Sequence, residues 1–263
     1  MIGTKNGFQN ISLWACTILI FAINGRGQSI QNFIENEPTG VEMLEKLGSE
    51  RNLTPLEKLL SKHFKASFAL DCRSLFATGS FKTQGEILPL TIVSKRPKYF
   101  FQSIYVNKTK IEAGYDGAGY WYVGPDLSDS DRSALNKAAF FMQADLGGLT
   151  WIYEREGVHS MRIVETRIFD GVACRAVSDD TPAGPMLYLI EGSNGRERGR
   201  VLELAVEDQK HTLKLIYQYD GVSGGQTDPR GYQLWLDGKI YAEASFTSIR
   251  RDQGVMPWSF RAP

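Results

Sequence analysis

The chain has 263 residues, 42% of them hydrophobic, and carries 30 Lys and Arg against 30 Asp and Glu, for a formal net charge of +0. This length fits one large all-β or α+β domain, and the hydrophobic content is enough for a sizeable core, which excludes global disorder. The charge balance excludes a general nucleic-acid binder, because no basic excess is available to neutralise phosphates.

Residues 11–23 form the only long apolar run of the sequence, and Lys5 lies before it. The run is too short to span a bilayer, which needs about 20 apolar residues. It is typical of the core of a signal peptide. We therefore interpret residues 1–27 as a signal peptide that directs the chain to the periplasm; the alternative, a buried helix of the mature fold, stays open.

Residues 28–68 are predicted to be an N-terminal helical segment. The clearest start signal is Thr54, which can cap a helix, with Pro55 in the first turn and Glu57 completing a capping box. The following leucines have helical spacing, so one face of this helix should pack on a sheet.

From residue 74 the periodicity changes to that of strands. Aromatic and β-branched residues in short runs, separated by turn residues, predict an antiparallel meander. The runs are 74–83, 87–94, 99–106, 109–113 and 119–123.

Residues 126–147 predict the one strong helix after this meander, ended by Gly147 and Gly148. Leu135 and Met142 belong to its apolar stripe, whereas Phe140 and Phe141 lie off the stripe. Such a helix suits a lid that contacts cargo, and equally a helix buried on both sides by its own protein.

More strands are predicted after this helix, separated by exposed loops at 192–199 and 221–230. The predicted strands are 160–169, 172–177, 186–191, 200–206, 212–219, 231–236, 239–249 and 255–260.

One set of residues carries a family resemblance. Arg96 and Pro97 are followed by Phe100, and an Asp116-Gly117 turn is followed by Trp121; near the end the same pattern continues in Phe246, Arg250, Gly254 and Pro257. This order and spacing resemble the LolA-like family of outer-membrane lipoprotein-sorting proteins. The resemblance implies a mainly β, α+β fold over residues 69–263: a half-open antiparallel β-barrel whose lid helix is 126–147.

The family implies a non-catalytic carrier of lipid or lipoprotein acyl chains in an apolar cavity, a monomer served by membrane-bound donor and acceptor proteins. We expect the cavity lining to come from the strands and from the lid, with core packing as the alternative for each residue. The expected lining residues are Phe100, Ile104, Tyr120 or Trp121 according to register, Leu135 and Met142.

The resemblance also implies a role for Arg96, which in the family ties the lid to the barrel through hydrogen bonds. Its planar fork of five donors suits helix-end carbonyls. The alternative is a solvent-facing basic residue beside Lys95 and Lys98.

A second interpretation is a periplasmic sensor or scaffold module that uses the same architecture to bind a protein or an envelope signal. We find no Gly-x-Ser-x-Gly or His-Glu-x-x-His pattern, so we expect no enzyme. We also expect no cofactor and no metal, because no residues have metal-ligand spacing. We expect no nucleic-acid partner, because the chain has no excess of basic residues.

Cys72 and Cys174 remain after removal of the signal peptide. In an oxidising compartment this pair could form a disulfide, and the alternative is two separate buried thiols.

Overall fold

Alternating apolar and polar side chains arrange most of the chain into one antiparallel sheet. The computed structural model describes residues 53–96, 98–106, 109–124, 130–156, 159–206, 208–219 and 228–262, with the backbone alone at 106, 130–133 and 153–156. Within these ranges the sheet has 12 strands in the order β5-β4-β3-β2-β1-β12-β11-β10-β9-β8-β7-β6. The strands are β1 (Ser74–Thr83), β2 (Glu86–Lys95), β3 (Tyr99–Val106), β4 (Thr109–Tyr115), β5 (Tyr120–Val123), β6 (Arg162–Phe169), β7 (Val172–Thr181), β8 (Gly184–Glu191), β9 (Glu197–Val206), β10 (Gln209–Gln218), β11 (Gly231–Leu236) and β12 (Lys239–Arg251).

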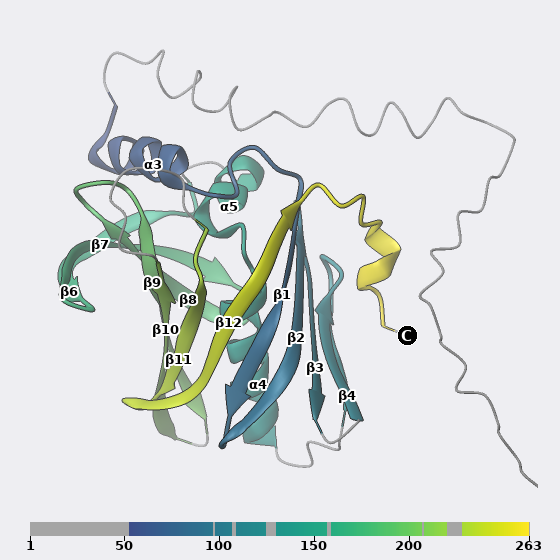
Figure 1. The fold of residues 1–263 in the computed structure, drawn as a ribbon. Coiled ribbons are helices and arrows are strands. Elements are labelled where there is room, and N and C mark those ends of the chain that lie inside the picture. Colours follow the sequence, from purple (N-terminus) through teal and green to yellow (C-terminus); the bar gives the residue numbers. More distant parts are fainter. Residues whose placement is uncertain are drawn as a thin grey trace, which may run out of the picture. The chain divides into compact units, whose positions relative to one another are not determined.

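The sheet is curved but not closed. Its two ends are β5 and β6, which do not pair with each other, and its middle is the pairing of the first strand with the last, β1 with β12. A bulge interrupts that pairing between Thr78 and Gly79, where the backbones come so close that a Cβ on Gly79 would lie 1.9 Å from the Ser245 carbonyl oxygen. Bulges bend strands and increase the local twist, so this one contributes to the curvature (Figure 1).

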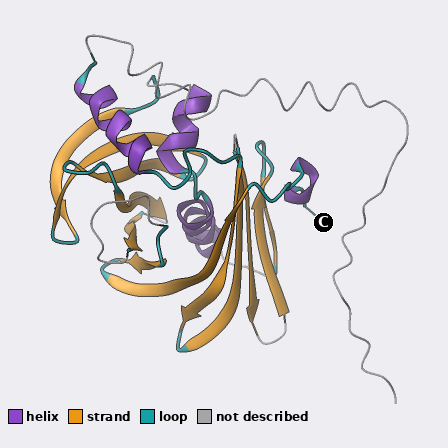
Figure 2. Ribbon diagram, turned by 45° about the horizontal axis from the view of Figure 1, so that its top comes forward, coloured by secondary structure: helices purple, strands orange, loops and turns teal. Residues whose placement is uncertain are grey.

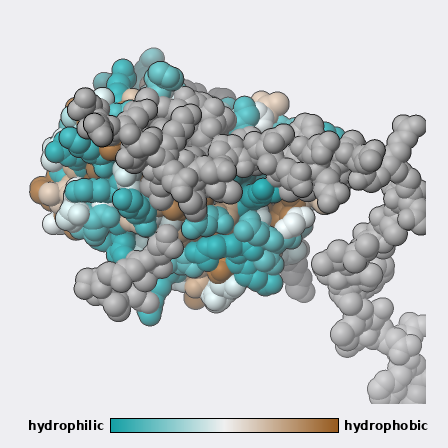
Figure 3. Space-filling view, turned by 90° about the horizontal axis from the view of Figure 1, so that it is seen from above, coloured by the Kyte–Doolittle hydropathy of each residue, from teal (hydrophilic) through white to brown (hydrophobic). Residues whose placement is uncertain are grey.

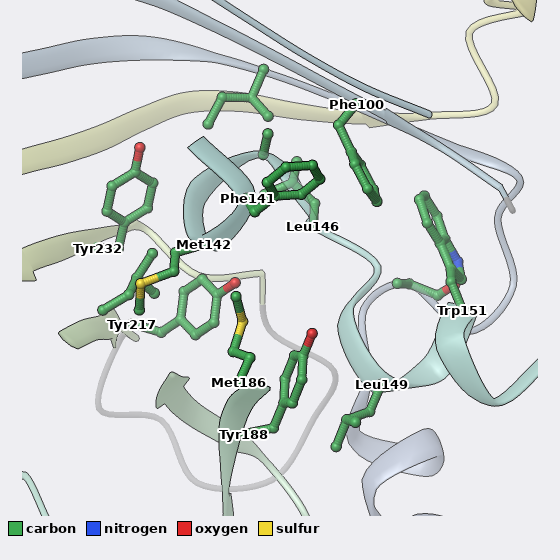
Figure 4. Packing of buried hydrophobic residues seen from close by; sticks show 14 of the residues in the cluster. Phe100, Phe141, Met142, Leu146, Leu149, Trp151, Met186, Tyr188, Tyr217 and Tyr232 are labelled. Carbon is green, nitrogen blue, oxygen red and sulfur yellow. The ribbon is translucent and has the colours of Figure 1, made fainter. Parts of the chain in front are cut away.

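Helix α4 (Ser130–Ala144) lies on the concave side of the sheet, surrounded by strands of both halves (Figures 1 and 2). Its last turns are hydrogen-bonded to β2, where the Ser94 hydroxyl donates to the Ala144 carbonyl and accepts from the Leu146 N–H at 2.9 Å. On the opposite side, the Tyr232 hydroxyl of β11 donates to the Gln143 side chain at 2.8 Å. The sheet and the helix together enclose the main hydrophobic core, part of which is drawn in Figure 4.

Two further helices, α3 (Pro55–Ala66) and α5 (Gly148–Glu156), lie near each other at one end of the half-barrel (Figure 1). The capping box that the sequence predicts at Thr54 and Glu57 is present, with both reciprocal hydrogen bonds. Between the two helices, the Trp151 indole N–H donates to the Ala69 carbonyl at 3.1 Å. Among the described residues, no helix is both long and apolar enough to cross a membrane.

The expected fold class, a mainly β half-open barrel with a helical lid, is confirmed, although several boundaries differ. The expected lid at 126–147 is observed as α4, and residues 126–129 lie outside the described ranges. Residues 192–199 are not a simple exposed loop, because β9 already begins at Glu197, which is buried. The strand expected at 255–260 is wrong: Pro257–Phe260 is a 3₁₀ helix, for which the fixed φ of Pro257 suits the first position.

Helix α5 was not predicted from the sequence. The sequence predicts a helix end at Gly147 and Gly148, but α4 already ends at Ala144. Gly148 begins α5, and its N–H donates to the Asp145 carboxylate at 2.9 Å. The expected signal peptide at 1–27 and the part of the expected helical segment at 28–52 lie outside the described residues.

The disulfide considered between Cys72 and Cys174 is not formed, and both are buried free thiols. Cys72 belongs to the main core on the concave side of the sheet, whereas Cys174 belongs to a separate cluster with Phe169 and Leu189. The two thiols are therefore held apart by packing, and the alternative of two separate buried thiols is the correct one.

His63 couples α3 to the turn before β9. Its Nδ1 lies 2.9 Å from the Gly195 carbonyl oxygen, which can only accept, so Nδ1 carries the proton. A Cβ at Gly195, whose φ is +79°, would lie 2.4 Å from the Lys62 backbone, so only glycine allows this close approach. Burial lowers the pKa of His63, because the charged imidazolium loses its hydration there; the nearby Glu197 carboxylate opposes this shift without reversing it.

We predict that stability falls on mild acidification because of His63. The pKa of His63 is lower in the folded than in the unfolded protein. The neutral side chain therefore contributes fully to the free energy of unfolding above the unfolded pKa of about 6.5, and this contribution is lost as the pH falls below that pKa. Between pH 7.5 and 5.5 the free energy of unfolding, measured in urea, should drop by about 1 kcal/mol from this residue. His63→Gln should remove that pH dependence, and His211→Gln should retain it; equal pH profiles for the two variants would contradict the assignment.

Candidate functional site

A cavity of about 500 Å³ lies between α4 and the concave face of β1–β5. None of the residues that line it is charged, and most are apolar or aromatic. They are Phe81, Thr83, Gln84, Leu88, Gln102, Ile104, Ile111, Ala113, Tyr120, Tyr122, Asn136, Ala139, Phe140, Gln143 and Tyr241. Thr83 and Gln84 end the β1–β2 hairpin, so the cavity extends to the open end of the half-barrel.

The cavity exists because small side chains face each other where the sheet and the helix approach. The alternation of β-strands turns Ile104 and Gln102 of β3, and Ala113 of β4, to the same face. Ala139 lies opposite them on α4, so neither wall fills the space between them. The volume is in the range of pockets that bind small ligands.

Two polar side chains of the lining, Gln102 and Gln143, are hydrogen-bonded near the C-terminal end of α4. The Gln102 amide donates to the Gln143 side-chain oxygen at 3.4 Å, and the Gln143 amide donates to the Ala139 carbonyl at 2.8 Å. Burial raises the pKa of Tyr120 to about 12, so its hydroxyl stays neutral at physiological pH. The cavity therefore has uncharged walls, and two of its polar side chains are hydrogen-bonded to each other.

The structure settles the register that the sequence left open between Tyr120 and Trp121. Tyr120 faces the cavity, and so does Ile104. Trp121 faces the other side of the sheet, where its indole N–H donates to the Phe260 carbonyl at 2.6 Å. Trp121 is therefore not part of the lining, because the side chains of a strand alternate between its two faces.

The other three expected lining residues also lie outside this cavity. Met142 of α4 is fully buried in the core, and Leu135, also of α4, is half-buried and does not line the cavity. Phe100 lines a second, smaller pocket of about 240 Å³ together with Phe141.

An aromatic wall, formed by Phe100, Tyr115, Tyr120, Phe140 and Phe141, separates the two pockets. Phe140 lines the larger pocket and Phe141 the smaller one, and their ring centroids are 5.3 Å apart. The ring of Tyr120 lies 5.4 Å from Phe140, and that of Tyr115 lies 5.1 Å from Phe141. The two phenylalanines that the sequence analysis placed off the apolar stripe of the helix thus form the partition.

Arg96 is buried, with 7% of its surface exposed, so the solvent-facing alternative does not hold. Its Nη2 donates to the carbonyls of Leu70 at 2.7 Å and Ala69 at 3.2 Å, and its guanidinium lies 5.8 Å from the centre of the Trp151 ring. These carbonyls belong to the segment after α3 and not to the expected lid helix at 126–147. The contacts join the end of β2 to α3 and α5.

A buried charged cluster beneath the end of α4 was missed in the sequence. Arg200 is fully buried, donates to Glu197 at 2.6 Å and to the Met142 carbonyl at 3.3 Å, and lies 4.0 Å from Asp145. Arg200 also lies over the rings of Tyr188 and Tyr217. Only the tertiary fold brings Asp145 to Arg200, so no local pattern could have shown this cluster.

One face of the molecule shows how polar and apolar residues are distributed on the described surface. Seen from above, the coloured atoms are mainly hydrophilic, with scattered hydrophobic areas (Figure 3). Over the part of the chain that the structure describes, no group of three or more His, Cys, Asp or Glu is arranged to hold a metal ion.

Comparison with known proteins shows a likeness in fold. No family model and no curated protein matches the sequence. Among solved structures, a LolA superfamily protein from Nitrosomonas europaea is similar with a TM-score of 0.52 and 12% identity, over 80% of this chain and 99% of that one. An outer membrane lipoprotein-sorting protein domain from Vibrio parahaemolyticus has a TM-score of 0.45 and 9% identity, over 78% of this chain and 94% of that chain. A DUF1329 family protein from Desulfovibrio piger has a TM-score of 0.45 and 14% identity, over 85% and 98%.

We predict that Arg96 is important for stability. Arg96→Leu should lower the free energy of unfolding by about 2–4 kcal/mol, because two carbonyls lose their donor and Trp151 loses its cationic neighbour. Arg175→Leu, on an exposed position of β7, is the matched control and should change stability by less than about 0.5 kcal/mol. Urea unfolding of both variants checks this, and equal effects would show that the buried contacts of Arg96 contribute little.

Proposed function

We propose that this protein, whose fold is that of a LolA superfamily protein, is a non-catalytic carrier or binder of lipid or lipoprotein acyl chains. The observation that supports the proposal is the uncharged cavity of about 500 Å³ between α4 and β1–β5. An acyl chain in this cavity would exchange water for the side chains of Ile104, Leu88 and Phe140. Each buried methylene then contributes about 0.8 kcal/mol before the cost of association is subtracted.

The geometry of the cavity suggests how cargo enters. Gln84 and Thr83 lie at the tip of the β1–β2 hairpin, and Tyr241 of β12, which also lines the cavity, is 42% exposed. The tail of a lipid would therefore insert from this open end, along α4, until it meets the aromatic wall.

The proposal places the protein in the periplasm, after removal of the apolar segment that we interpret as a signal peptide. There the surrounding water favours enclosure of acyl chains in a protein. Membrane-bound donor and acceptor proteins would load and unload the cargo.

Arg96 is proposed as a latch, although its partners differ from those expected. It ties β2 to the segment after α3 and to α5, next to the point where α4 ends. Loading that shifts α4 would be opposed by this connection, and loss of the latch would make an apolar probe bind more tightly or leave more slowly.

The alternative, a sensor or scaffold module with an interior filled by its own side chains, has less support. The core does fill the space around Met142, but the cavity on the β1–β5 side remains open.

The test is to fill the cavity with a side chain. Ala113→Phe, from the β4 wall, should reduce the affinity for cis-parinaric acid by at least about tenfold, because the ring occupies the space of several methylenes. Ala205→Phe, at an exposed position of β9, is the matched control and should bind like the wild type. Fluorescence titration measures both affinities, and thermal unfolding verifies that both variants are folded.

A second measurement identifies the natural cargo. Mass spectrometry of an organic extract of the protein, purified from its native envelope, should show acylated molecules with the wild type and fewer with Ala113→Phe. Undiminished probe binding by Ala113→Phe, together with extracts free of lipid, would refute carriage in this cavity.

A further inference from the structure

We infer that the smaller pocket, on the other side of the aromatic wall, binds a primary ammonium group. This pocket has a volume of about 240 Å³ and lies between the end of α4, the start of β3 and the hairpin that joins β7 to β8. It shares no lining residue with the larger cavity, so the inference does not depend on the proposed carriage of lipid.

Aromatic side chains form one part of the lining, namely Phe100, Tyr115, Phe141 and Tyr188. Phe100 and Tyr115 stack with their ring centroids 6.1 Å apart, and Phe141 meets Tyr115 edge-on at 5.1 Å. The faces of aromatic rings attract cations, and clusters of such rings bind ammonium groups.

Carboxylates form the other part of the lining. Asp145, Asp179 and Asp180 face one cationic residue, Lys98. Asp145 is already engaged by Arg200 and by the Gly148 N–H. Asp179 is 1% exposed, and Asp180 is exposed at the end of β7. The pocket therefore presents the accessible carboxylate of Asp180 beside further carboxyl oxygens that can accept hydrogen bonds, which favours a cationic ligand over an anion.

An independent observation comes from the hydroxyl of Tyr188. Tyr188 is fully buried, and over the described part of the chain its hydroxyl has no hydrogen-bond partner. Figure 4 shows this hydroxyl on the side of the ring that faces Phe141 and Leu146, where the pocket lies. A buried polar group without a partner is unfavourable, and a ligand that supplies one is correspondingly favoured.

These features together specify a primary ammonium group. Its three N–H donors can reach the Tyr188 hydroxyl and the carboxylates at once, while its charge is attracted by the rings. A quaternary ammonium has the charge but no N–H group, so it would leave Tyr188 without a partner. An amine-bearing lipid headgroup, whose ammonium is carried on a short ethanolamine-like arm, fits this small pocket of about 240 Å³. Preference for a lysine side chain of another protein is the outcome that would contradict this source.

The experiment titrates the full-length mature protein with ethanolamine, by calorimetry and by the amide resonance of Gly148. We expect saturable binding of ethanolamine, at least about fivefold weaker binding of choline, and no binding of acetate. Glycerophosphoethanolamine and Nα-acetyl-lysine methylamide distinguish the two sources: the tighter of the two identifies whether a lipid headgroup or a protein side chain is preferred.

Two pairs of variants test the assigned residues. Tyr188→Phe should weaken ethanolamine binding by about fivefold, whereas Tyr217→Phe, which removes an equally buried hydroxyl outside the pocket, should not. Asp180→Asn should weaken binding similarly, and Asp208→Asn, in the exposed turn before β10, should leave it unchanged.

Ala113→Phe separates this inference from the proposed function, because it fills the larger cavity and should not alter ethanolamine binding. Absence of saturable ethanolamine binding, choline binding equal to that of ethanolamine, or equal affinities in Tyr188→Phe and Tyr217→Phe would each overturn the assignment.

Discussion

The last turns of α4 are held by both halves of the curved sheet at the same time. On one side Ser94 of β2 bonds the backbone at Ala144 and Leu146, and on the other Tyr232 of β11 bonds Gln143 and Arg200 of β9 bonds the Met142 carbonyl. A helix end normally leaves several carbonyls without partners, and here side chains of the sheet supply them. This double attachment fixes the C-terminal end of the helix inside the half-barrel.

Both pockets are consequences of where that attachment lies. Because α4 is fixed near its C-terminal end, the small side chain of Ala139 lies opposite the small side chain of Ala113 of β4. The larger cavity lies between these two walls. At the attached end the consecutive residues Phe140 and Phe141 point to opposite pockets and close the passage between them. One interior is therefore divided into an uncharged compartment and a compartment with carboxylates.

Much of the fold was predictable from the sequence, because the relevant signals are local. The alternation in β3, the capping box at Thr54 and the Asp-Gly turns each specify their own structure without help from distant residues. The side of β5 that faces the cavity was not predictable, because both faces bury aromatic residues: Tyr120 packs against α4 and Trp121 against the C-terminal segment. The buried charges of Arg200 and Glu197 could not be predicted either, since hydrophilic residues before a strand normally indicate exposure, and their partner Asp145 is distant in sequence.

The pairing of β1 with β12 has a consequence for the biogenesis of the protein. Within the described residues, β1 and β12 are the one strand pair that joins the two halves of the sheet, and its partners, such as Leu75 and Arg251, are separated by most of the domain. Contacts between such distant residues slow folding, because a long loop must be ordered before they form. The N-terminal half cannot complete its sheet until the final strand has been synthesised. The long-range β1–β12 pair can therefore form only after the last strand has been synthesised, later than the local hairpins within either half of the sheet.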